Sequence, residues 1–279
     1  MIKSTNTKLF IGTLLMSTFL LVNCSSDDDG GSSGSSGSTG STDTTNDITY
    51  DATNSLLVNS ELHAAFAEFD TDETDIYVDG NDIVIETTGL PNHTTPYWSE
   101  SHPLYVEPTV TTVQRMTGSR IDTSGRDFFA TLSVPTSVGT ANRTTATDLG
   151  SIGIAVSGAF IFNDQEGNGT LDAAAGGLDY TGAHIGPSVY HYHLEPEAFS
   201  YDDDNLVGII SDGFFIYGRK CNSTGTYPED LDTSGGHVHQ TQHSDGDEYH
   251  YHIINEIYST TGSYILFAGP YQGTPNAIN

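Results

Sequence analysis

Two copies of the tetrapeptide Tyr-His-Tyr-His, at residues 190–193 and 249–252, carry the side chains of this 279-residue chain that are best suited to chemistry. In a β-strand, side chains at positions i and i+2 point to the same face. The two histidines of each copy then share one face, and the two tyrosines share the other. Imidazoles two residues apart start roughly 6–7 Å apart at Cβ, so they can lean together and bind one ion.

Each copy is preceded by a further histidine that would complete a set of three imidazoles. The two predicted ligand sets are His184, His191 and His193, and His237, His250 and His252. Three imidazoles on one ion leave a fourth position open, and neutral imidazole suits Zn, Cu, Ni or Fe. The spacing therefore predicts transition-metal binding, with Zn or Cu expected, at two separate sites or at one joint site.

The same histidines could also have a structural role in place of metal binding. Tyr-His-Tyr-His also suits a half-buried β surface with cross-strand aromatic pairs, where the imidazoles would bind backbone or carboxylate groups. We favour metal because the motif and its upstream histidine occur twice. His239 and His243 are weaker ligand candidates. The histidines expected to be structural or at the surface are His63, His93 and His102.

Acidic residues near the two sets have less specific roles. Asp179 and Asp232 recur in Leu-Asp-x-x-Gly segments. Each could orient an imidazole by accepting its second N–H or cap a turn, and both interpretations stay open at this stage. If a bound metal activated water or O₂, Glu195 or Glu248 could transfer a proton, but no catalytic residue is singled out.

An acidic loop offers a second kind of ion site. Its candidate calcium ligands are Asp164, Glu166, Asn168 and Asp172. They stand at positions 1, 3, 5 and 9 of an EF-hand-like loop, but Ala175 occupies position 12, which needs a bidentate glutamate. We favour an acidic turn over a calcium site.

Three pairs of segments match in the same order, which indicates an internal duplication. The matches are 153–163 with 208–218, 178–184 with 231–237, and 190–193 with 249–252, at offsets of 55, 53 and 59 residues. Two units at about residues 150–205 and 206–262 are therefore predicted, packed about an approximate two-fold axis in one domain.

Short β-branched and aromatic runs alternate with turn signals along the chain. Hairpins are predicted at residues 76–85, 153–162 and 208–217. One helix is expected over residues 60–69, capped by Ser60. This pattern is typical of a mainly β, antiparallel, sandwich- or barrel-like single domain with little helix.

The N-terminal residues predict export and a lipid anchor. Residues 1–23 have the charge and apolar run of a secretory leader that is too short to span a bilayer. The leader ends at Cys24 in a sequence that resembles a bacterial lipobox, where the cysteine is lipidated. Residues 25–29 resemble the acidic surface-export signal of lipoproteins in the Bacteroidetes group. We expect a flexible acidic and Gly/Ser-rich linker at 24–46 and an outer-membrane protein exposed at the cell surface through its domain at 47–279.

The charge balance excludes some partners. With 37 Asp+Glu against 8 Lys+Arg, the formal net charge is −29, the wrong sign for binding nucleic-acid phosphates or an anionic membrane surface. Cys221 is the only cysteine besides Cys24. It cannot supply a disulfide framework or a four-thiolate site, and we expect it to be a buried apolar side chain.

These segments together resemble the YHYH domain family. The resemblance rests on both Tyr-His-Tyr-His copies and on residues 211–218, 150–158 and 89–93, and it covers about residues 76–273. It implies the type of domain, and the family carries no established activity or cofactor. The function predicted first is a surface lipoprotein that binds a transition metal. The alternatives are a metal-dependent hydrolase or oxidoreductase with an open three-histidine site, and an adhesion or glycan-binding module without such a metal, whose protein or glycan partner is unknown.

Overall fold

The structure is a computed structural model that describes residues 52–108, 120–123, 128–140, 145–167 and 169–279. The predicted leader, Cys24 and the linker lie outside the described residues, as does Asn168. Within the described ranges, no helix combines the length and the apolar character needed to cross a bilayer.

The three predicted hairpins are confirmed. They are β4 (Thr74–Asp79) with β5 (Asp82–Thr87), β8 (Gly153–Ala155) with β9 (Phe160–Ile161), and β14 (Leu206–Ile210) with β15 (Phe215–Tyr217). Their turn glycines Gly80, Gly158 and Gly213 all have positive φ. Tight hairpin turns need this conformation, which costs glycine little.

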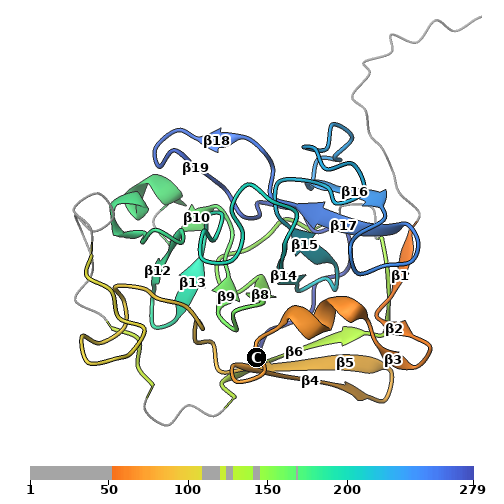
Figure 1. Ribbon diagram of the computed structural model, residues 1–279, viewed down its shortest axis with the longest axis horizontal. Coiled ribbons are helices and arrows are strands. Elements are labelled where there is room, and N and C mark those ends of the chain that lie inside the picture. Colours follow the sequence, from red (N-terminus) through yellow and green to blue (C-terminus); the bar gives the residue numbers. More distant parts are fainter. Residues whose placement is uncertain (1–51, 109–119, 124–127, 141–144, 168) are drawn as a thin grey trace, which may run out of the picture. The chain divides into compact units, whose positions relative to one another are not determined.

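An eight-stranded sheet forms the centre of the protein (Figure 1). Its order is β12 (Ala183–Ile185), β13 (Tyr190–Tyr192), β9, β8, β14, β15, β17 (Glu248–His252) and β16 (Gly236–His239). The sheet is open, with β12 and β16 at its edges, so the barrel-like form is wrong. The mainly β, antiparallel class is confirmed, although β13 pairs parallel with β9, and β15 with β17. Long crossovers join these parallel pairs.

The order of the sheet has two-fold symmetry about the antiparallel pair β8–β14. The paired residues there are Gly153 with Ile210, Ile154 with Ile209, and Ala155 with Gly208. Exchanging positions that are 55 residues apart swaps the two outer pairs of this ladder and returns the central pair Ile154–Ile209 to itself. The duplicated segments therefore lie in equivalent places on either side of one axis.

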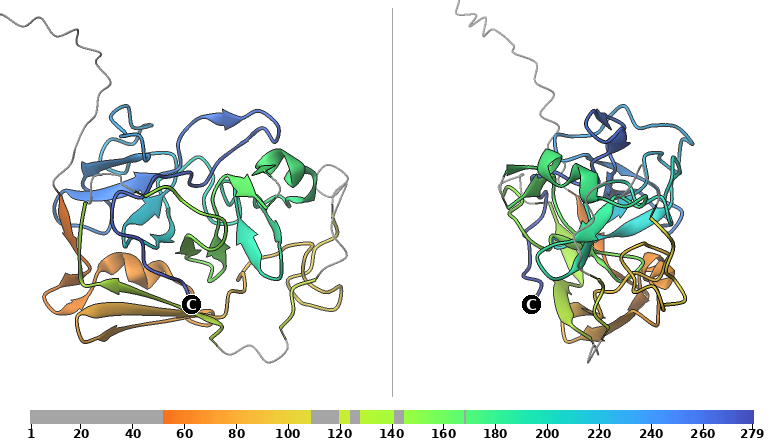
Figure 2. Two further views of the ribbon diagram at one scale, coloured as in Figure 1. Left: turned by 180° about the vertical axis from the view of Figure 1, so that it is seen from behind. Right: turned by 90° about the vertical axis from the view of Figure 1, so that its left-hand side faces the viewer.

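Smaller sheets complete the fold. They are β4–β5–β6 (Ala130–Pro135), β1 (Thr53–Ser55) with β7 (Ser137–Gly139), β2 (Leu57–Val58) with β3 (Glu61–Leu62), β10 (Gln165–Glu166) with β11 (Gly169–Thr170), and β18 (Ile257–Tyr258) with β19 (Ser263–Tyr264). Both views in Figure 2 show the three-stranded sheet beside the central one. One hydrophobic core joins them, because Ile83 and Leu132 belong to the same buried cluster as Ile154 and Tyr251.

The predicted helix is shorter than expected. The structure has a 3₁₀-helix, η1, at Ala64–Glu68. Its cap is His63, whose Nδ1 accepts a hydrogen bond from Ala65 N at 3.2 Å. Ser60 instead has φ of 69° and lies in the turn before β3. The helical spacing of apolar residues over 60–69 therefore corresponds only to the short 3₁₀-helix η1. Two further 3₁₀-helices lie at Leu171–Ala173 and Ala175–Gly177.

Candidate metal centres

The Tyr-His-Tyr-His strands place tyrosines and histidines on opposite faces, as the strand period predicts. The tyrosines point into the core, where Tyr190 OH donates to Asp179 Oδ2 at 2.7 Å. Tyr249 OH donates to Asp232 Oδ2 at 3.0 Å in the equivalent position. The motif thus ties its strand to the core on one face and leaves the other face to the imidazoles.

Asp179 and Asp232 are turn caps. Asp179 Oδ1 accepts from the backbone N–H of Thr181 at 2.9 Å. Asp232 Oδ1 accepts from Ser234 N at 2.8 Å. Among the described residues, both carboxylates contact backbone, hydroxyl and amide groups. These contacts fit the capping interpretation and do not support the one in which each carboxylate orients an imidazole.

The second tyrosine of each motif is also anchored. Tyr192 OH lies 2.8 Å from Ser157 Oγ, and Tyr251 OH donates to Asp212 Oδ2 at 2.6 Å. Burial raises the pKa of the Asp212 carboxyl, against the opposing effect of the Tyr251 hydrogen bond.

We expect Tyr251→Phe to lower the free energy of unfolding by about 1–3 kcal/mol. The change removes the donor to buried Asp212 and the acceptor that Gln272 N uses at 2.7 Å. Urea unfolding measures the effect. Tyr258→Phe is the control, because Tyr258 donates to Asp172 in an exposed pair, and it should change stability by no more than about 0.5 kcal/mol.

In the C-terminal unit, three imidazoles each donate Nδ1–H to an oxygen and turn Nε2 inward. The acceptors are Asp230 Oδ1 for His237 (2.8 Å), Glu248 O for His250 (3.0 Å) and Gly218 O for His252 (2.7 Å). A carbonyl or carboxylate oxygen can only accept, so Nδ1 must carry the hydrogen. Nε2 of each neutral ring is then a bare lone pair.

These three lone pairs converge. The Nε2 atoms of His237, His250 and His252 lie 3.0–3.2 Å from one another. Burial holds the pKa of His250 well below its ordinary value and lowers that of His252 to about 4, and it also lowers the pKa of His237. The rings are thus neutral at pH 7, and no proton is available to bridge them. Nitrogens about 2.0–2.1 Å from a tetrahedral zinc ion would lie roughly 3.3–3.4 Å apart, close to what is observed.

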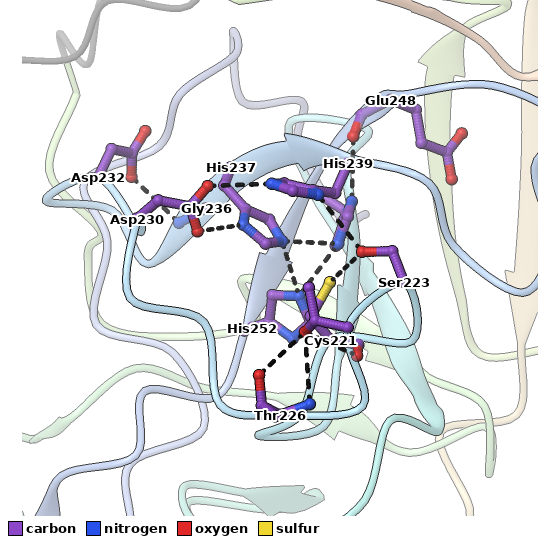
Figure 3. Close-up of polar contacts among 12 residues, drawn as sticks. Cys221, Ser223, Thr226, Asp230, Asp232, Gly236, His237, His239, Glu248 and His252 are labelled. Carbon is purple, nitrogen blue, oxygen red and sulfur yellow. Dashed lines mark hydrogen bonds and ion pairs between the residues drawn. The ribbon is translucent and has the colours of Figure 1, made fainter.

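Cys221 supplies a fourth donor to this group. Its Sγ and the three Nε2 atoms lie within 4.8 Å of one another, and all four residues are buried. Figure 3 shows Cys221 beside His252, on the turn that its backbone closes with Thr226. Cys221 is buried as expected, but it faces imidazoles in place of apolar neighbours. We call Cys221, His237, His250 and His252 the thiol site.

Asp230 has the orienting role predicted for Asp232. Its carboxylate binds His237 Nδ1 and, 3.1 Å away, His239 Nε2 (Figure 3). Burial alone would raise the pKa of Asp230, but its contacts with the two imidazoles lower it overall. A carboxylate that accepts N–H from a ligating histidine fixes the ring and strengthens the ligand.

The N-terminal unit has an equivalent group. His191 Nδ1 donates to Val189 O at 3.1 Å and His193 Nδ1 to Asn163 O at 2.6 Å, while their Nε2 atoms lie 2.9 Å apart. Burial holds the pKa of His191 well below its ordinary value. Phe162 stacks on the His191 ring, with centroids 3.7 Å apart.

Glu166 completes this second group. Its Oε1 lies 2.9 Å from His184 Nε2 and 3.1 Å from His193 Nε2. Both Glu166 Oε1 and His184 Nε2 are buried atoms that make no hydrogen bond within the described residues. A cation between them would satisfy both atoms at once. We call Glu166, His184, His191 and His193 the carboxylate site.

The two sites are separate. β13 and β17 stand five strand intervals apart in the sheet, which is roughly 24 Å at the usual strand spacing. Each group of four takes its ligands from one unit. The geometry therefore fits the two-site alternative and not one joint site.

The two fourth donors occupy equivalent positions. Glu166 and Cys221 are 55 residues apart, the same offset that relates Asn163 and Gly218, whose carbonyls hold the last histidine of each motif. Extending the matched segments 153–163 and 208–218 by three residues at their C-terminal ends reaches Glu166 and Cys221 and would have identified both donors. Sequence reasoning missed them because it assigned one to a calcium loop and the other to the core.

The remaining candidates lie elsewhere. Glu195 forms a buried ion pair with Arg219 at 2.9 Å. Glu248 binds His63 Nε2 at 3.2 Å, so its carboxylate anchors η1. His243 contacts Tyr217 OH at 3.1 Å and belongs to neither site. His93 Nε2 accepts from Tyr192 OH at 2.5 Å, and His102 stacks on Trp98 with centroids 4.0 Å apart.

The predicted calcium ligands do not form one group among the described residues. Glu166 is part of the carboxylate site, and the Asp172 carboxylate accepts hydrogen bonds from Tyr258 and Thr260. Asn168 lies outside the described residues. The potential metal groups found among the described residues include neither Asp164 nor Asp172, so a calcium site stays a prediction.

The symmetric sheet and the two histidine groups define a duplicated β protein with buried sites whose geometry can hold a metal ion. The family model described as YHYH protein matches residues 131–229. This match confirms the resemblance, over a shorter stretch than residues 76–273, so the chain contains a YHYH domain. The match includes the first Tyr-His-Tyr-His copy and ends before the second. No curated protein and no solved structure matches the chain.

Proposed function

We propose that this protein is an outer-membrane lipoprotein, anchored through Cys24 and exposed at the cell surface, that binds two transition-metal ions. One ion is held at the thiol site and one at the carboxylate site. Zinc and copper are among the ions that imidazole suits, and they are the two that we expect here. The role is metal binding or sequestration.

One observation carries this proposal. At the thiol site, three neutral imidazoles with their Nδ1–H groups already donated turn three lone pairs to within 3.2 Å of one another. Without a cation, these buried lone pairs face one another and repel. A metal ion satisfies all three at once, at distances close to those of tetrahedral coordination.

Metal stoichiometry tests the proposal. The untagged chain, with Cys24→Ser to remove the lipid and its thiol, is dialysed against Zn²⁺ or Cu²⁺ and analysed for bound metal. We expect two ions per chain, because each histidine group is complete within its own unit. His191→Ala and His250→Ala should each leave one ion, and the double variant should leave none.

His243→Ala is the matched control, since His243 lies outside both sites, and it should keep two ions. A double variant that still binds two ions would contradict the ligand assignment. A protein that binds neither Zn²⁺ nor Cu²⁺ at micromolar concentration would contradict metal binding altogether and favour the adhesion or glycan-binding alternative.

The exposure of the carboxylate site favours one second candidate, a metal-dependent hydrolase. The Glu166 side chain is 21 % exposed and that of His184 is 10 % exposed, so this site lies nearer to solvent than the thiol site, although Glu166 Oε1 and His184 Nε2 are themselves buried. A metal that exchanges a carboxylate for water gains an activated nucleophile. The signature of this alternative would be hydrolysis that is lost in His191→Ala and kept in His250→Ala.

A further inference from the structure

The equivalent positions 166 and 221 carry chemically different donors. Glu166 offers a hard carboxylate oxygen and Cys221 offers a soft sulfur, while the three imidazoles are the same in both sites. Soft thiolate donors favour Zn and Cu(I), and carboxylates are compatible with harder ions. The duplicated scaffold therefore provides two sites that differ in one ligand.

The two sites also differ in the exposure of their ligand side chains. Cys221 and the three histidines of the thiol site are at most 2 % exposed, whereas Glu166 is 21 % exposed in its side chain. A buried site with four protein ligands is the form that structural zinc takes, and exchangeable or catalytic zinc keeps a position that water can reach. A carboxylate at the edge of a site can leave the ion while the imidazoles stay bound.

Charge favours a divalent ion at the thiol site. A divalent ion with the Cys221 thiolate has a net charge of +1, and the Asp230 carboxylate on His237 brings the total to zero. Burying a neutral set costs far less than burying a net charge. Ser223 Oγ, 3.1 Å from Cys221 Sγ, can donate to the sulfur and stabilise the thiolate.

We infer that the two sites have separate roles: the thiol site holds a permanent structural zinc ion, and the carboxylate site holds an exchangeable ion that takes water or an anion in place of Glu166. This inference rests on the proposed function. It assigns metal exchange to the carboxylate site in one half of the sheet and structural support to the thiol site in the other half.

Cobalt exchange tests the inference. The full chain with Cys24→Ser is loaded with two Co²⁺ ions, so Cys221 is its single thiol, and then challenged with excess EDTA. Sulfur-to-cobalt charge-transfer absorption in the near ultraviolet reports the thiol site alone. We expect one ion to leave while this absorption persists, and the second to leave at least about tenfold more slowly, on the scale by which ligand environments alter metal retention.

Reciprocal substitutions sharpen the test. Glu166→Cys should place a second thiolate at the carboxylate site, so the charge-transfer absorption should rise about twofold per chain and both ions should leave slowly. Cys221→Glu should abolish the absorption. If a variant fails to fold, the EDTA experiment on the chain with Glu166 and Cys221 unchanged still tests the inference.

Equal release rates for the two ions would overturn the inference while leaving two-site binding intact, as would earlier loss of the ion that carries the charge-transfer absorption. Two bound ions with no such absorption would show that Cys221 is not a ligand and would also overturn it. Failure to bind Co²⁺ at all, repeated with Zn²⁺, would reject the proposed function itself.

Discussion

Acidifying the metal-free protein from pH 7 to pH 4 is expected to remove about 3 kcal/mol of stability through His252 alone. Burial lowers the pKa of this imidazole to about 4 in the folded chain, against about 6.5 when unfolded. Between these values the unfolded chain binds a proton that the folded chain does not. Stability is therefore complete above about pH 6.5, falls as the pH drops, and levels off below about pH 4.

His191 and His250 add to this effect in the same direction, because burial also holds their pKa values well below the ordinary one. Urea unfolding in EDTA at several pH values measures the dependence. The variant His252→Gln separates this imidazole from titrating carboxylates. Between about pH 4 and pH 6.5, the free energy of unfolding of this variant should depend less steeply on pH, because the difference in bound protons between the unfolded and folded states is smaller by up to about one. A slope equal to that of the parent protein would contradict the assignment.

Gly208→Ala is expected to lower the free energy of unfolding by about 3 kcal/mol or more. A Cβ atom at Gly208 would overlap Ile154 O on the neighbouring strand, and one at Gly153 would lie 2.6 Å from Ile209 O. Both glycines sit in the β8–β14 ladder at the two-fold axis. Neither backbone can yield without separating the two halves of the sheet, so Gly153→Ala should have a similar effect.

Gly246→Ala provides the matched control for these two changes. A Cβ atom there would meet nothing within 4 Å, and its φ is not in the left-handed region. It should alter stability by no more than about 1 kcal/mol. Urea unfolding of the three variants decides the matter: equal stability would mean that the strands at the axis are not in close contact.

Features that depend on strand periodicity were predictable from the sequence. Tyrosines 190 and 249 lie on the face opposite His191 and His250, because alternation along a strand admits no other arrangement. The hairpins followed from glycine-containing turns at residues 80, 158 and 213, and the offsets between repeated segments predicted equivalent units. The family match then confirmed the type of domain.

The side chains that reach the sites from turns and loops were not predictable from strand periodicity. Glu166 and Cys221 reach their sites from tight turns, the first opposite Gly169 and the second opposite Thr226. Turn conformation has no period that a hydrophobic pattern can reveal. The carboxylate of Asp230 likewise reaches His237, seven positions further along the chain, across a loop, while the more conspicuous Asp232 caps its own loop.

The symmetric β8–β14 pairing has a consequence for how such a protein can change. Two identical half-length chains could form the same eight-stranded sheet as a homodimer, because an isologous interface would pair the strand at the axis with its own copy. In that homodimer every substitution would appear twice, and both pockets would have to bind alike. Joining the halves in one polypeptide removes this constraint, so one pocket can carry sulfur while its counterpart carries oxygen.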